Sequence, residues 1–241
     1  MQDALRLSVV VPAFNEGHRL PATLSRVVAF LAGSDRWLPA EVVVVDDGSS
    51  DDTVAVAEGH PRASGVQVRV LEQGENRGKG AAVRAGLAAS RGEWVLVSDA
   101  DLAAPIEDVD LLRAADVDLA AGSRAVRREL ISRRQPWPRD LMGRGFNLLL
   151  RVLGLTSLRD TQCGFKLLRG AVARQLAAAL RLDGFAFDVE LLARARRLGA
   201  TIAEVPVHWQ HVDDSRVQAL RHSLQMARDV LRLRVWLWIG R

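Results

Sequence analysis

One stretch decides the fold of this chain: residues 42–51 read Val-Val-Val-Val-Asp-Asp-Gly-Ser-Ser-Asp. Four consecutive β-branched residues predict a strand covered on both faces, as in a parallel sheet. The strand delivers two adjacent carboxylates, Asp46 and Asp47, to its carboxyl end, where Gly48 permits a sharp turn. The serines that follow are explained as caps of the next helix. Capping does not explain the paired carboxylates, which repel each other, so we interpret them as part of a binding site.

Similar apolar runs recur along the chain, and helical patterns separate them. This alternation predicts an α/β fold, in which a mostly parallel sheet carries helices on both sides within a single domain. We expect strands at 7–11, 42–45, 66–71, 94–97, 118–121 and 202–207. We expect helices near 20–32, 52–58, 80–90, 107–114, 140–153, 169–181, 186–198 and from about 216. The arginine-rich stretch 125–139 contains two prolines, and we expect it to form a mobile basic loop.

Polar residues cluster directly after three of the expected strands. The clusters are Pro12–Glu16, Asp46–Asp52 and Ser98–Asp101. Because ligands of α/β sheets gather at the carboxyl ends of the strands, this coincidence predicts one site at that edge. The Pro12–Glu16 cluster alone also fits a plain turn in which Asn15 or Glu16 caps the next helix.

The third cluster carries metal-ligand chemistry. Side chains two apart share a face in extended backbone, so Asp99 and Asp101 can point at one site. Paired carboxylates suit Mg²⁺ or Mn²⁺, which take their other ligands from substrate phosphates and water. His208 and His211 also have a metal-like spacing, but the intervening Trp209-Gln210 and the nearby strand end argue against ligation.

A glycine-rich turn, Glu-Asn-Arg-Gly-Lys-Gly at 75–80, opens an expected helix. Helix N-termini attract phosphate. However, Gly80 stands where a Walker A motif needs Ser or Thr, and Val83 stands where a dinucleotide fingerprint needs its third glycine. Lys79 therefore either reaches a ligand phosphate or stays solvated at the helix start, and the sequence leaves both open.

The composition limits the partners and the location. The chain has 241 residues, 49% of them hydrophobic and 26% charged, which is ordinary for one soluble globular domain. A net charge of +4 and a pI near 10.3 favour anionic partners. Cys163 is the single cysteine, so nothing indicates an oxidising compartment. The first residues lack the pattern of a signal peptide, and no run of about 18 apolar residues occurs, so we expect peripheral membrane contact at most.

Together these clusters resemble family 2 glycosyltransferases of the GT-A fold. The matching stretches are Val10–Glu16, Asp46–Asp51, Asn76–Gly80 and Asp99–Asp101, and further on Ala121–Arg124, Arg159–Lys166, Phe187–Leu192 and Glu204–Trp209. The Asp-Thr-Gln-Cys-Gly-Phe-Lys stretch at 160–166 is the most selective, and it is similar to the dolichyl-phosphate glucosyltransferase branch, close to polyprenyl-phosphate mannose synthases. The resemblance covers nearly the whole chain. It implies a Rossmann-like GT-A domain over 1–215 and a C-terminal amphipathic helix over 216–241.

The resemblance implies roles for the matching positions. The nucleoside pocket would be lined by Pro12, Ala13, Glu16, Asp46 and Asp47. The donor diphosphate would meet Lys79, Asp99, Ala100 and Asp101, with Asp101 as the chief metal ligand beside Asp99. The donor and acceptor phosphates and the sugar would face Arg124, Arg139, Gln162, Asp188, Ser215 and Arg216. Among these, the catalytic group would be Asp101, Arg124, Asp188 and Arg216. One departure is Asp213-Asp214 before Ser215, where the related branch tends to have a glycine.

The resemblance further implies inverting transfer of a hexose, in the first place glucose from UDP-glucose, to a dolichyl or polyprenyl phosphate. Mg²⁺ or Mn²⁺ on Asp101 would stabilise the leaving diphosphate. Because the second pKa of a phosphomonoester is about 6, the acceptor is mostly ionised near neutral pH and needs no general base; Asp188 is the alternative. GDP-mannose as donor and another acceptor stay open. The carboxylates and arginines argue against a non-catalytic nucleotide binder, and the acidic strand tips oppose nucleic acid.

A lipid acceptor implies an enzyme on the cytoplasmic face of a membrane. The final segment mixes Leu and Trp with Arg, which suits an interfacial helix. It equally suits a packed C-terminal helix with a basic outer face, and the sequence favours neither. The stretch Leu141–Leu155 is the other candidate for membrane contact.

Overall fold

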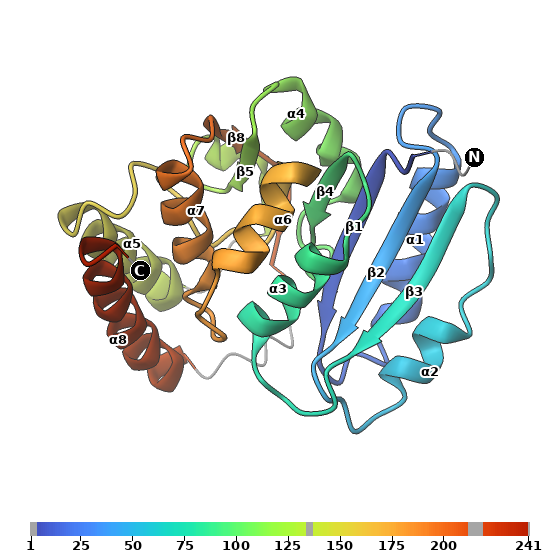
Figure 1. Cartoon of the computed structure of the whole chain (residues 1–241), viewed down its shortest axis with the longest axis horizontal. Coiled ribbons are helices and arrows are strands. Elements are labelled where there is room, and N and C mark those ends of the chain that lie inside the picture. Colours follow the sequence, from blue (N-terminus) through green and yellow to red (C-terminus); the bar gives the residue numbers. More distant parts are fainter. Residues whose placement is uncertain (1–3, 134–136, 212–218, 241) are drawn as a thin grey trace.

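The computed structural model describes residues 4–133, 137–211 and 219–240. Its centre is a seven-stranded sheet in the order β3-β2-β1-β4-β7-β5-β8 (Figure 1). The strands are β1 (Leu7–Ala13), β2 (Ala40–Asp46), β3 (Val66–Glu72), β4 (Trp94–Val97), β5 (Leu119–Ser123), β7 (Lys166–Arg169) and β8 (Ile202–Pro206). All pairings are parallel except those of β7, which runs antiparallel to both neighbours. The predicted mostly parallel α/β sheet is therefore confirmed.

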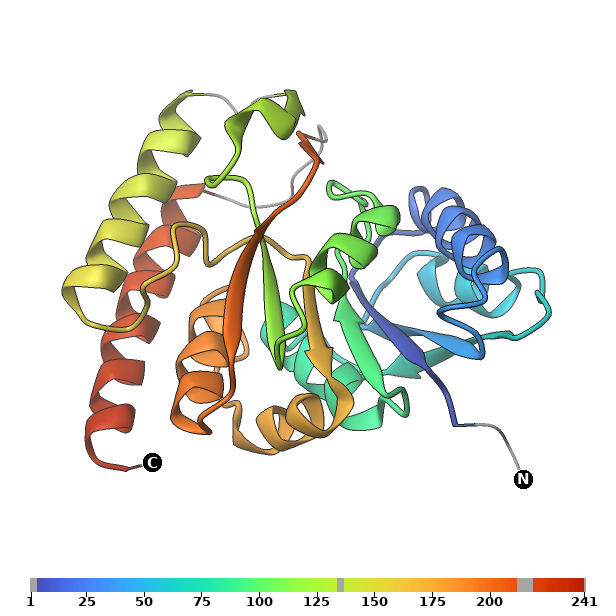
Figure 2. The ribbon, with the colours of Figure 1, turned by 90° about the horizontal axis from the view of Figure 1, so that it is seen from above.

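Helices cover both faces of the sheet, as the figures show from two directions (Figures 1 and 2). One face packs against α1 (Leu20–Ala32), α2 (Thr53–Glu58), the 3₁₀ turn η1 (Ile106–Asp108) and α4 (Val109–Ala114). The other packs against α3 (Lys79–Ala89), α6 (Gly170–Ala179) and α7 (Phe187–Arg197). Further out lie α5 (Trp137–Val152) and α8 (Ala219–Trp238).

The valine runs form strands because both of their faces are buried. In β1 and β2 every residue is buried. Val42 and Val44 pack into the core on the α1 side, whereas Val43 and Val45 pack into the core on the α3 side. An unbroken apolar run is the pattern expected when a strand has no solvent-facing side.

One strand of the seven-stranded sheet, β7, was not predicted, and it is the strand that runs antiparallel to its neighbours. Its sequence is Lys-Leu-Leu-Arg, with only two apolar residues between two charges, so it lacks a strand pattern. It nevertheless lies between β4 and β5, and Lys166 is 1% exposed there. Burial of a lysine inside a sheet depends on partners from other elements, and these are not visible in the local sequence.

The expectation of a loop over 125–139 is wrong in part. A 3₁₀ turn, η2 (Arg128–Leu130), leads into the short strand β6 (Ile131–Arg133), and α5 already begins at Trp137. β6 pairs in parallel with β9 (Trp209–Gln210) in a separate two-stranded sheet. Backbone pairing with a segment 78 positions away at Ile131 and Trp209 is a tertiary contact that arginine-rich composition conceals.

A third apolar core joins the outer helices to the domain. It contains Leu150 of α5, Val189 of α7, and Val230 and Leu233 of α8, all almost fully buried. One face of α8 is thus packed against the protein. Among the helices of the described residues, none combines the length and the apolar character needed to cross a membrane.

A buried charge cluster closes the edge of the sheet where β2 begins. Glu41 is fully buried and accepts hydrogen bonds from Ser8 Oγ (2.6 Å), Arg69 Nε (2.8 Å) and Arg91 Nη2 (2.7 Å). Burial alone would raise the pKa of Glu41, but these donors hold it below its ordinary value of 4.5. A depressed folded pKa stabilises the fold above 4.5, and this stabilisation is lost as the pH falls through the folded value.

Replacing Glu41 by Gln is expected to lower the free energy of unfolding by about 2 kcal/mol at neutral pH, because charge-assisted hydrogen bonds are lost. The difference from wild type should shrink in acid, where the native carboxyl is itself protonated. Urea denaturation at neutral pH and at a pH well below 4.5 measures both values. A penalty that does not change between the two pH values would contradict this electrostatic explanation.

Candidate active site

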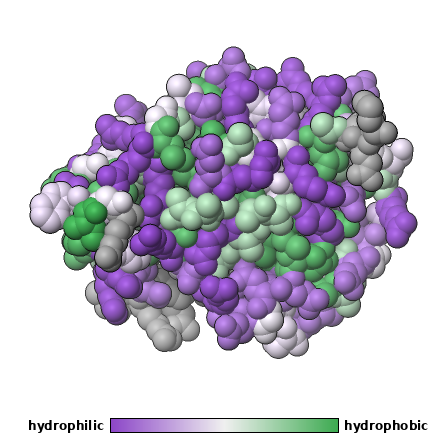
Figure 3. All heavy atoms as spheres, viewed as in Figure 1, coloured by the Kyte–Doolittle hydropathy of each residue, from purple (hydrophilic) through white to green (hydrophobic). Residues whose placement is uncertain are grey.

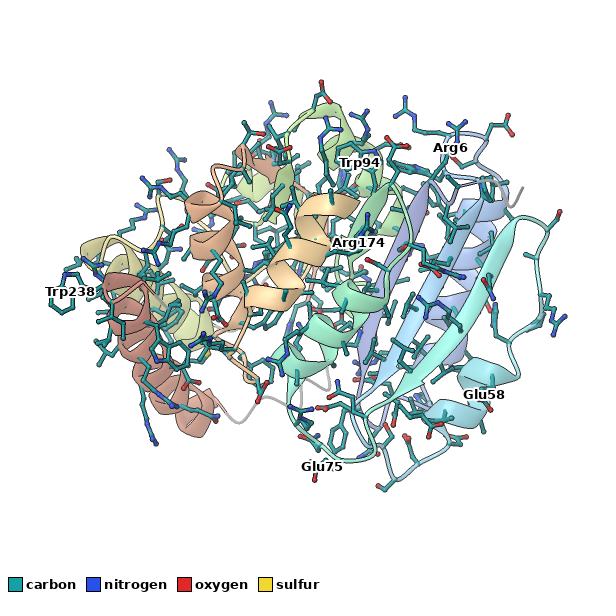
Figure 4. The ribbon with its side chains drawn as sticks, in the orientation of Figure 1. Arg6, Glu58, Glu75, Trp94, Arg174 and Trp238 are labelled. Atoms are coloured by element: carbon teal, nitrogen blue, oxygen red, sulfur yellow. The ribbon has the colours of Figure 1, made fainter. Side chains whose placement is uncertain are left out.

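The carboxyl ends of the parallel strands meet at one edge, and the predicted polar clusters lie there. In Figure 1 the arrowheads of β1, β2 and β3 end at this edge, and Figure 4 shows Glu75 at its rim, in the loop before α3. Ala13 at the end of β1 pairs with Asp46 at the end of β2, and Pro12 pairs with Val45. The tip of β4 follows on the other side of β1.

Asp46 is buried, and only one of its two carboxylate oxygens has a hydrogen-bond partner in the described part of the chain. Its Oδ2 accepts hydrogen bonds from the backbone N–H groups of Gly48 (3.1 Å) and Ser49 (3.0 Å). Its Oδ1 is buried and has no hydrogen-bond partner in the described part of the chain. A buried acceptor of this kind costs free energy unless a ligand supplies a donor. Asp46 can therefore receive an N–H or O–H group.

Asp47, unlike Asp46, has hydrogen-bond partners for both of its carboxylate oxygens. Its two oxygens accept the backbone N–H groups of Arg77 and Gly78, both at 2.8 Å. Burial, more than the nearby charge of Asp46, raises the pKa of Asp47. The side chain thus fixes the glycine-rich turn that presents Lys79 to the site.

The loop after β1 is tied to the loop after β2. Asn15 adopts a left-handed backbone with φ of 52°, and its side-chain oxygen accepts the N–H of Ser50 at 2.7 Å. Glu16 is half-buried, donates its backbone N–H to Thr53 Oγ1, and pairs with Arg19 at 3.5 Å. The expectation that Asn15 or Glu16 caps the next helix is wrong, because the N-cap of α1 is Arg19 and no side chain caps it. The Asn15 side chain instead joins the loop after β1 to the loop after β2.

Lys79 reaches across the edge to a carboxylate. Its Nζ lies 2.5 Å from Asp99 Oδ1 and 5.9 Å from the ring centre of Phe187. Burial alone would lower the pKa of Lys79, but the nearby carboxylates, Asp99 first, raise it above its ordinary value. The lysine is thus a charged part of the site and is not simply solvated.

The surroundings of Asp101 disfavour its charged form on balance. Its Oδ1 accepts the backbone N–H of Ala103 at 3.0 Å. Burial first, and the like charge of Asp99 second, raise the pKa of Asp101. Ala100 between them is buried, and its carbonyl accepts the Thr23 hydroxyl. The two carboxylates are therefore close enough to interact, and a bound cation would relieve their repulsion.

Asp99 is positioned by a glycine. A Cβ at Gly164 would lie only 2.2 Å from Asp99 Oδ2, so no larger residue fits without moving the carboxylate. Gly164→Ala is therefore expected to shift Asp99 and to lower kcat/KM by roughly 100-fold, since displacements near 1 Å have costs of this order. Steady-state kinetics measures the effect. Gly145→Ala is the matched control, because a Cβ there meets nothing within 4 Å; equal kinetics for both variants would contradict the packing argument.

Arg124 follows β5 and is held by a carboxylate. Its Nε and Nη2 donate to the two oxygens of Asp160 at 2.7 and 2.9 Å, and it lies over the Trp209 ring at 5.4 Å. Burial would raise the pKa of Asp160, but the guanidinium lowers it below its ordinary value. Glu204 in turn accepts the N–H of Asp160 at 2.8 Å. The sequence analysis assigned no role to Asp160 or Glu204, although both lie in motifs it quoted.

A buried ion pair lies beneath the site. Lys166 Nζ donates to Asp188 Oδ1 and to the Cys163 carbonyl, both at 2.5 Å. Burial raises the pKa of Asp188 more than Lys166 and Lys79 lower it. Burial also raises the pKa of the Cys163 thiol, to about 11, so this cysteine is inert at neutral pH. Sequence reasoning named Asp188 but missed Lys166 as its partner.

Of the remaining predicted site residues, one has a contact outside the carboxylate cluster, and the side chains of three others lie outside the described part of the chain. Gln162 directs Nε2 at Met226 Sδ, 3.7 Å away. Arg139 belongs to α5, but its side chain lies outside the described part, and so do Ser215 and Arg216. The Nδ1 atom of His208 lies 3.0 Å from Asp108 Oδ1. Within the described residues, no group of three or more His, Cys, Asp or Glu side chains is arranged to hold a metal.

The chain is similar to known proteins in sequence and in fold. Residues 8–176 match the model of Glycosyl transferase family 2. The dolichyl-phosphate beta-glucosyltransferase of Drosophila melanogaster is 42% identical over 98% of this chain and 77% of its own length. The human protein of the same name is 40% identical over 95% of this chain and 75% of its own length.

Solved structures share the fold at lower identity. Glucosyl-3-phosphoglycerate synthase from Mycobacterium tuberculosis in complex with UDP has a TM-score of 0.70 and 24% identity, over 95% of this chain and 80% of that one. The same protein with Mn²⁺, UDP-glucose and phosphoglyceric acid has a TM-score of 0.69 and 23% identity, over 95% of this chain and 80% of that one. Mannosyl-3-phosphoglycerate synthase from Rubrobacter xylanophilus has a TM-score of 0.69 and 21% identity, over 98% of this chain and 75% of that one.

Proposed function

The chain belongs to glycosyl transferase family 2, and from this premise we propose that it transfers glucose from UDP-glucose to the phosphate of a dolichyl or other polyprenyl phosphate. The observation that carries the proposal is the 42% identity, over nearly the whole chain, to a protein named dolichyl-phosphate beta-glucosyltransferase. The site supports it with three features that a nucleotide-sugar donor requires: an unsatisfied buried acceptor, a pair of carboxylates and several fixed cations.

We assign the nucleoside to the edge between β1 and β2. Asp46 Oδ1 is a buried acceptor that lacks a donor within the described residues, and the base or ribose supplies one. Pro12, Ala13 and Glu16 form the adjacent wall. Asp47 acts indirectly, through its two hydrogen bonds to the glycine-rich turn.

We assign a divalent cation, Mg²⁺ or Mn²⁺, to Asp101 with Asp99 beside it. Two carboxylates fit a metal that takes its remaining ligands from a diphosphate and water. Asp99 is already neutralised by Lys79, whereas burial and Asp99 disfavour the charged form of Asp101, so Asp101 gains more from a cation. When bound, the metal acts as a Lewis acid on the leaving diphosphate. A solved structure of the same fold contains both Mn²⁺ and UDP-glucose, which supports a divalent metal as the partner of this donor.

We assign the stabilisation of the leaving group to fixed cations. Arg124 is held by Asp160 through Nε and Nη2, so its orientation is set before the substrate binds. Lys79 is within reach of the same region through its contact with Asp99. Preorganised charges of this kind stabilise developing negative charge without reorganisation. Arg139, Ser215 and Arg216 are proposed as further phosphate contacts.

We propose a single displacement in which the acceptor phosphate attacks the anomeric carbon directly. A phosphomonoester is mostly dianionic near neutral pH, so no proton has to be removed. Asp188, the alternative base, is 5% exposed and pairs with Lys166, which favours a positioning role beneath the sugar. Gln162 is proposed to border the acceptor.

We propose that the protein lies on the cytoplasmic face of a membrane, with residues 1–215 as the transferase domain and 216–241 as an accessory helix. The helix α8 combines the two alternatives left open by the sequence. Val230 and Leu233 pack against the domain, whereas Leu231 and Trp238 are 54% and 81% exposed.

One assay tests the reaction. The chain is incubated with Mg²⁺, a short polyprenyl phosphate in detergent and a panel of nucleotide sugars, and the lipid product is identified by mass. We expect a polyprenyl-phosphate hexose with UDP-glucose. A product only with GDP-mannose would assign the chain to the mannose alternative, and no lipid product with any donor would overturn the lipid acceptor.

A further inference from the structure

The outer face of α8 carries a second apolar stripe that no part of the described protein covers. Leu231, Val235, Trp238 and Ile239 follow the i, i+4, i+7, i+8 spacing of one helical face, and they are 47–81% exposed. Figure 4 shows Trp238 pointing away from the molecule at the outer end of the helix. Trp236 instead packs in the third core, within 6 Å of the guanidinium groups of Arg181 and Arg232.

Beside this stripe lies a hollow of about 350 Å³ between the ends of three helices. Its apolar lining comes from Gly154, Leu155, Ala193 and Leu237. Its charged lining consists of Arg196 and Arg197 from the last turn of α7 and Arg234 from α8. Val152 and Leu198, which are close in sequence to the lining residues Gly154 and Arg197, have exposed side chains. Figure 3 shows apolar side chains among hydrophilic ones at this end of the molecule.

The three arginines of the hollow lack anionic partners. Within the described residues none of their guanidinium groups forms a hydrogen bond or an ion pair, whereas those of Arg84, Arg124 and Arg194 each pair with a carboxylate. Arginines near helix C-termini offset the helix dipole, and this accounts for some positive charge here. It does not explain why guanidinium groups from two helices line one hollow without a carboxylate among its lining residues.

We propose that this hollow, which we call the arginine groove, binds the phosphate of an anionic phospholipid while the stripe on α8 enters the acyl boundary of the same bilayer. The combination of Arg on a polar flank with Leu, Val and Trp on the apolar side is the chemistry of interfacial helices. Each arginine near an anionic membrane surface contributes favourably, and an occupant phosphodiester accepts hydrogen bonds from more than one guanidinium. The proposal rests on the proposed function in one respect, that the acceptor is a membrane lipid. It names a second lipid contact, away from the transferring site.

Vesicle flotation tests the groove. The full chain is mixed with vesicles of phosphatidylcholine alone or of an equal mixture of phosphatidylcholine and phosphatidylglycerol. We expect wild type to float mainly with the anionic vesicles. The triple variant Arg196→Gln, Arg197→Gln, Arg234→Gln should partition roughly 100-fold more weakly, because three surface charges are removed.

The matched control removes the same charge elsewhere, in the triple variant Arg6→Gln, Arg36→Gln, Arg62→Gln. These arginines lie outside α5, α7 and α8, and all three are exposed. We expect the control to keep most of its binding. An equal loss in both triple variants would reduce the effect to net charge and would overturn the groove. Equal flotation of wild type with neutral and anionic vesicles, or no flotation at all, would overturn it too.

A second pair of variants tests the stripe. Val235→Ser with Trp238→Ser removes two exposed apolar side chains without altering charge, and we expect flotation to fall at least tenfold from the lost apolar burial. Unchanged flotation would contradict insertion of α8. An assay of sugar transfer to a detergent-dispersed polyprenyl phosphate separates membrane binding from the proposed activity. The triple variant of the groove should keep this transfer activity. Vesicle binding without any lipid product would contradict the proposed function but would still support phospholipid binding by the arginine groove.

Discussion

Asp101→Asn is expected to lower kcat/KM for sugar transfer by about 100- to 1,000-fold, the loss typical when one preorganised electrostatic contact to the transition state is removed. The substitution should not lower the stability of the folded protein. Burial and Asp99 raise the pKa of Asp101, so the ionised carboxylate destabilises the folded chain at neutral pH. The metal-free variant should therefore unfold at the same Tm as wild type or at a higher one.

Thermal unfolding with and without Mn²⁺ is the readout that does not depend on activity. We expect Mn²⁺ to raise the Tm of wild type and to leave that of Asp101→Asn nearly unchanged, since ligands stabilise only the state that binds them. Asp35→Asn is the matched control, because this aspartate is exposed at the opposite edge, between α1 and β2. Near-normal turnover by Asp101→Asn would contradict the metal assignment.

Lys166→Met is expected to destabilise the protein by about 3–5 kcal/mol, because it removes the hydrogen-bonded partner of the buried Asp188 carboxylate. Both partners are almost fully buried, at 1% and 5% exposure, so solvent cannot take the place of the lysine. Urea denaturation at neutral pH measures the loss. A penalty below about 1 kcal/mol, the size expected of an exposed pair, would contradict the buried-pair assignment.

The double variant Lys166→Met, Asp188→Leu separates stability from function. Replacing both partners with apolar residues should recover most of the unfolding free energy, since no charge stays buried. Turnover should not return, because Lys166 also contributes to the positive field that lowers the pKa of Asp99. Recovery of both stability and turnover would show that the pair serves only the fold.

The sequence predicted the parallel strands and their tips because both depend on local patterns. A strand buried on both faces needs an unbroken apolar run, and Val42–Val45 is one. The polar residues that follow this strand must then lie at the carboxyl edge of the sheet, and this does not depend on how the helices pack. The elements missed were those set by distant partners: β7, which places Lys166 inside the sheet, and the pairing of β6 with β9.

The same limit applies to the site. The sequence identified the carboxylates Asp46, Asp99 and Asp101, but not which of them is already neutralised. That depends on Lys79, whose ammonium reaches Asp99 from the start of another helix. Likewise Asp160 and Glu204 stand in quoted motifs, but their support of Arg124 is visible only when β5 and β8 are paired.

The central claim is that these acidic strand tips converge on a sugar nucleotide through a divalent cation. Anomalous diffraction from a crystal of this chain soaked with Mn²⁺ and UDP-glucose tests it most directly. We expect one manganese peak at the Asp101 carboxylate, in contact with the diphosphate, and the uridine beside Asp46 Oδ1. A donor bound away from both aspartates, or manganese bound elsewhere, would contradict the account.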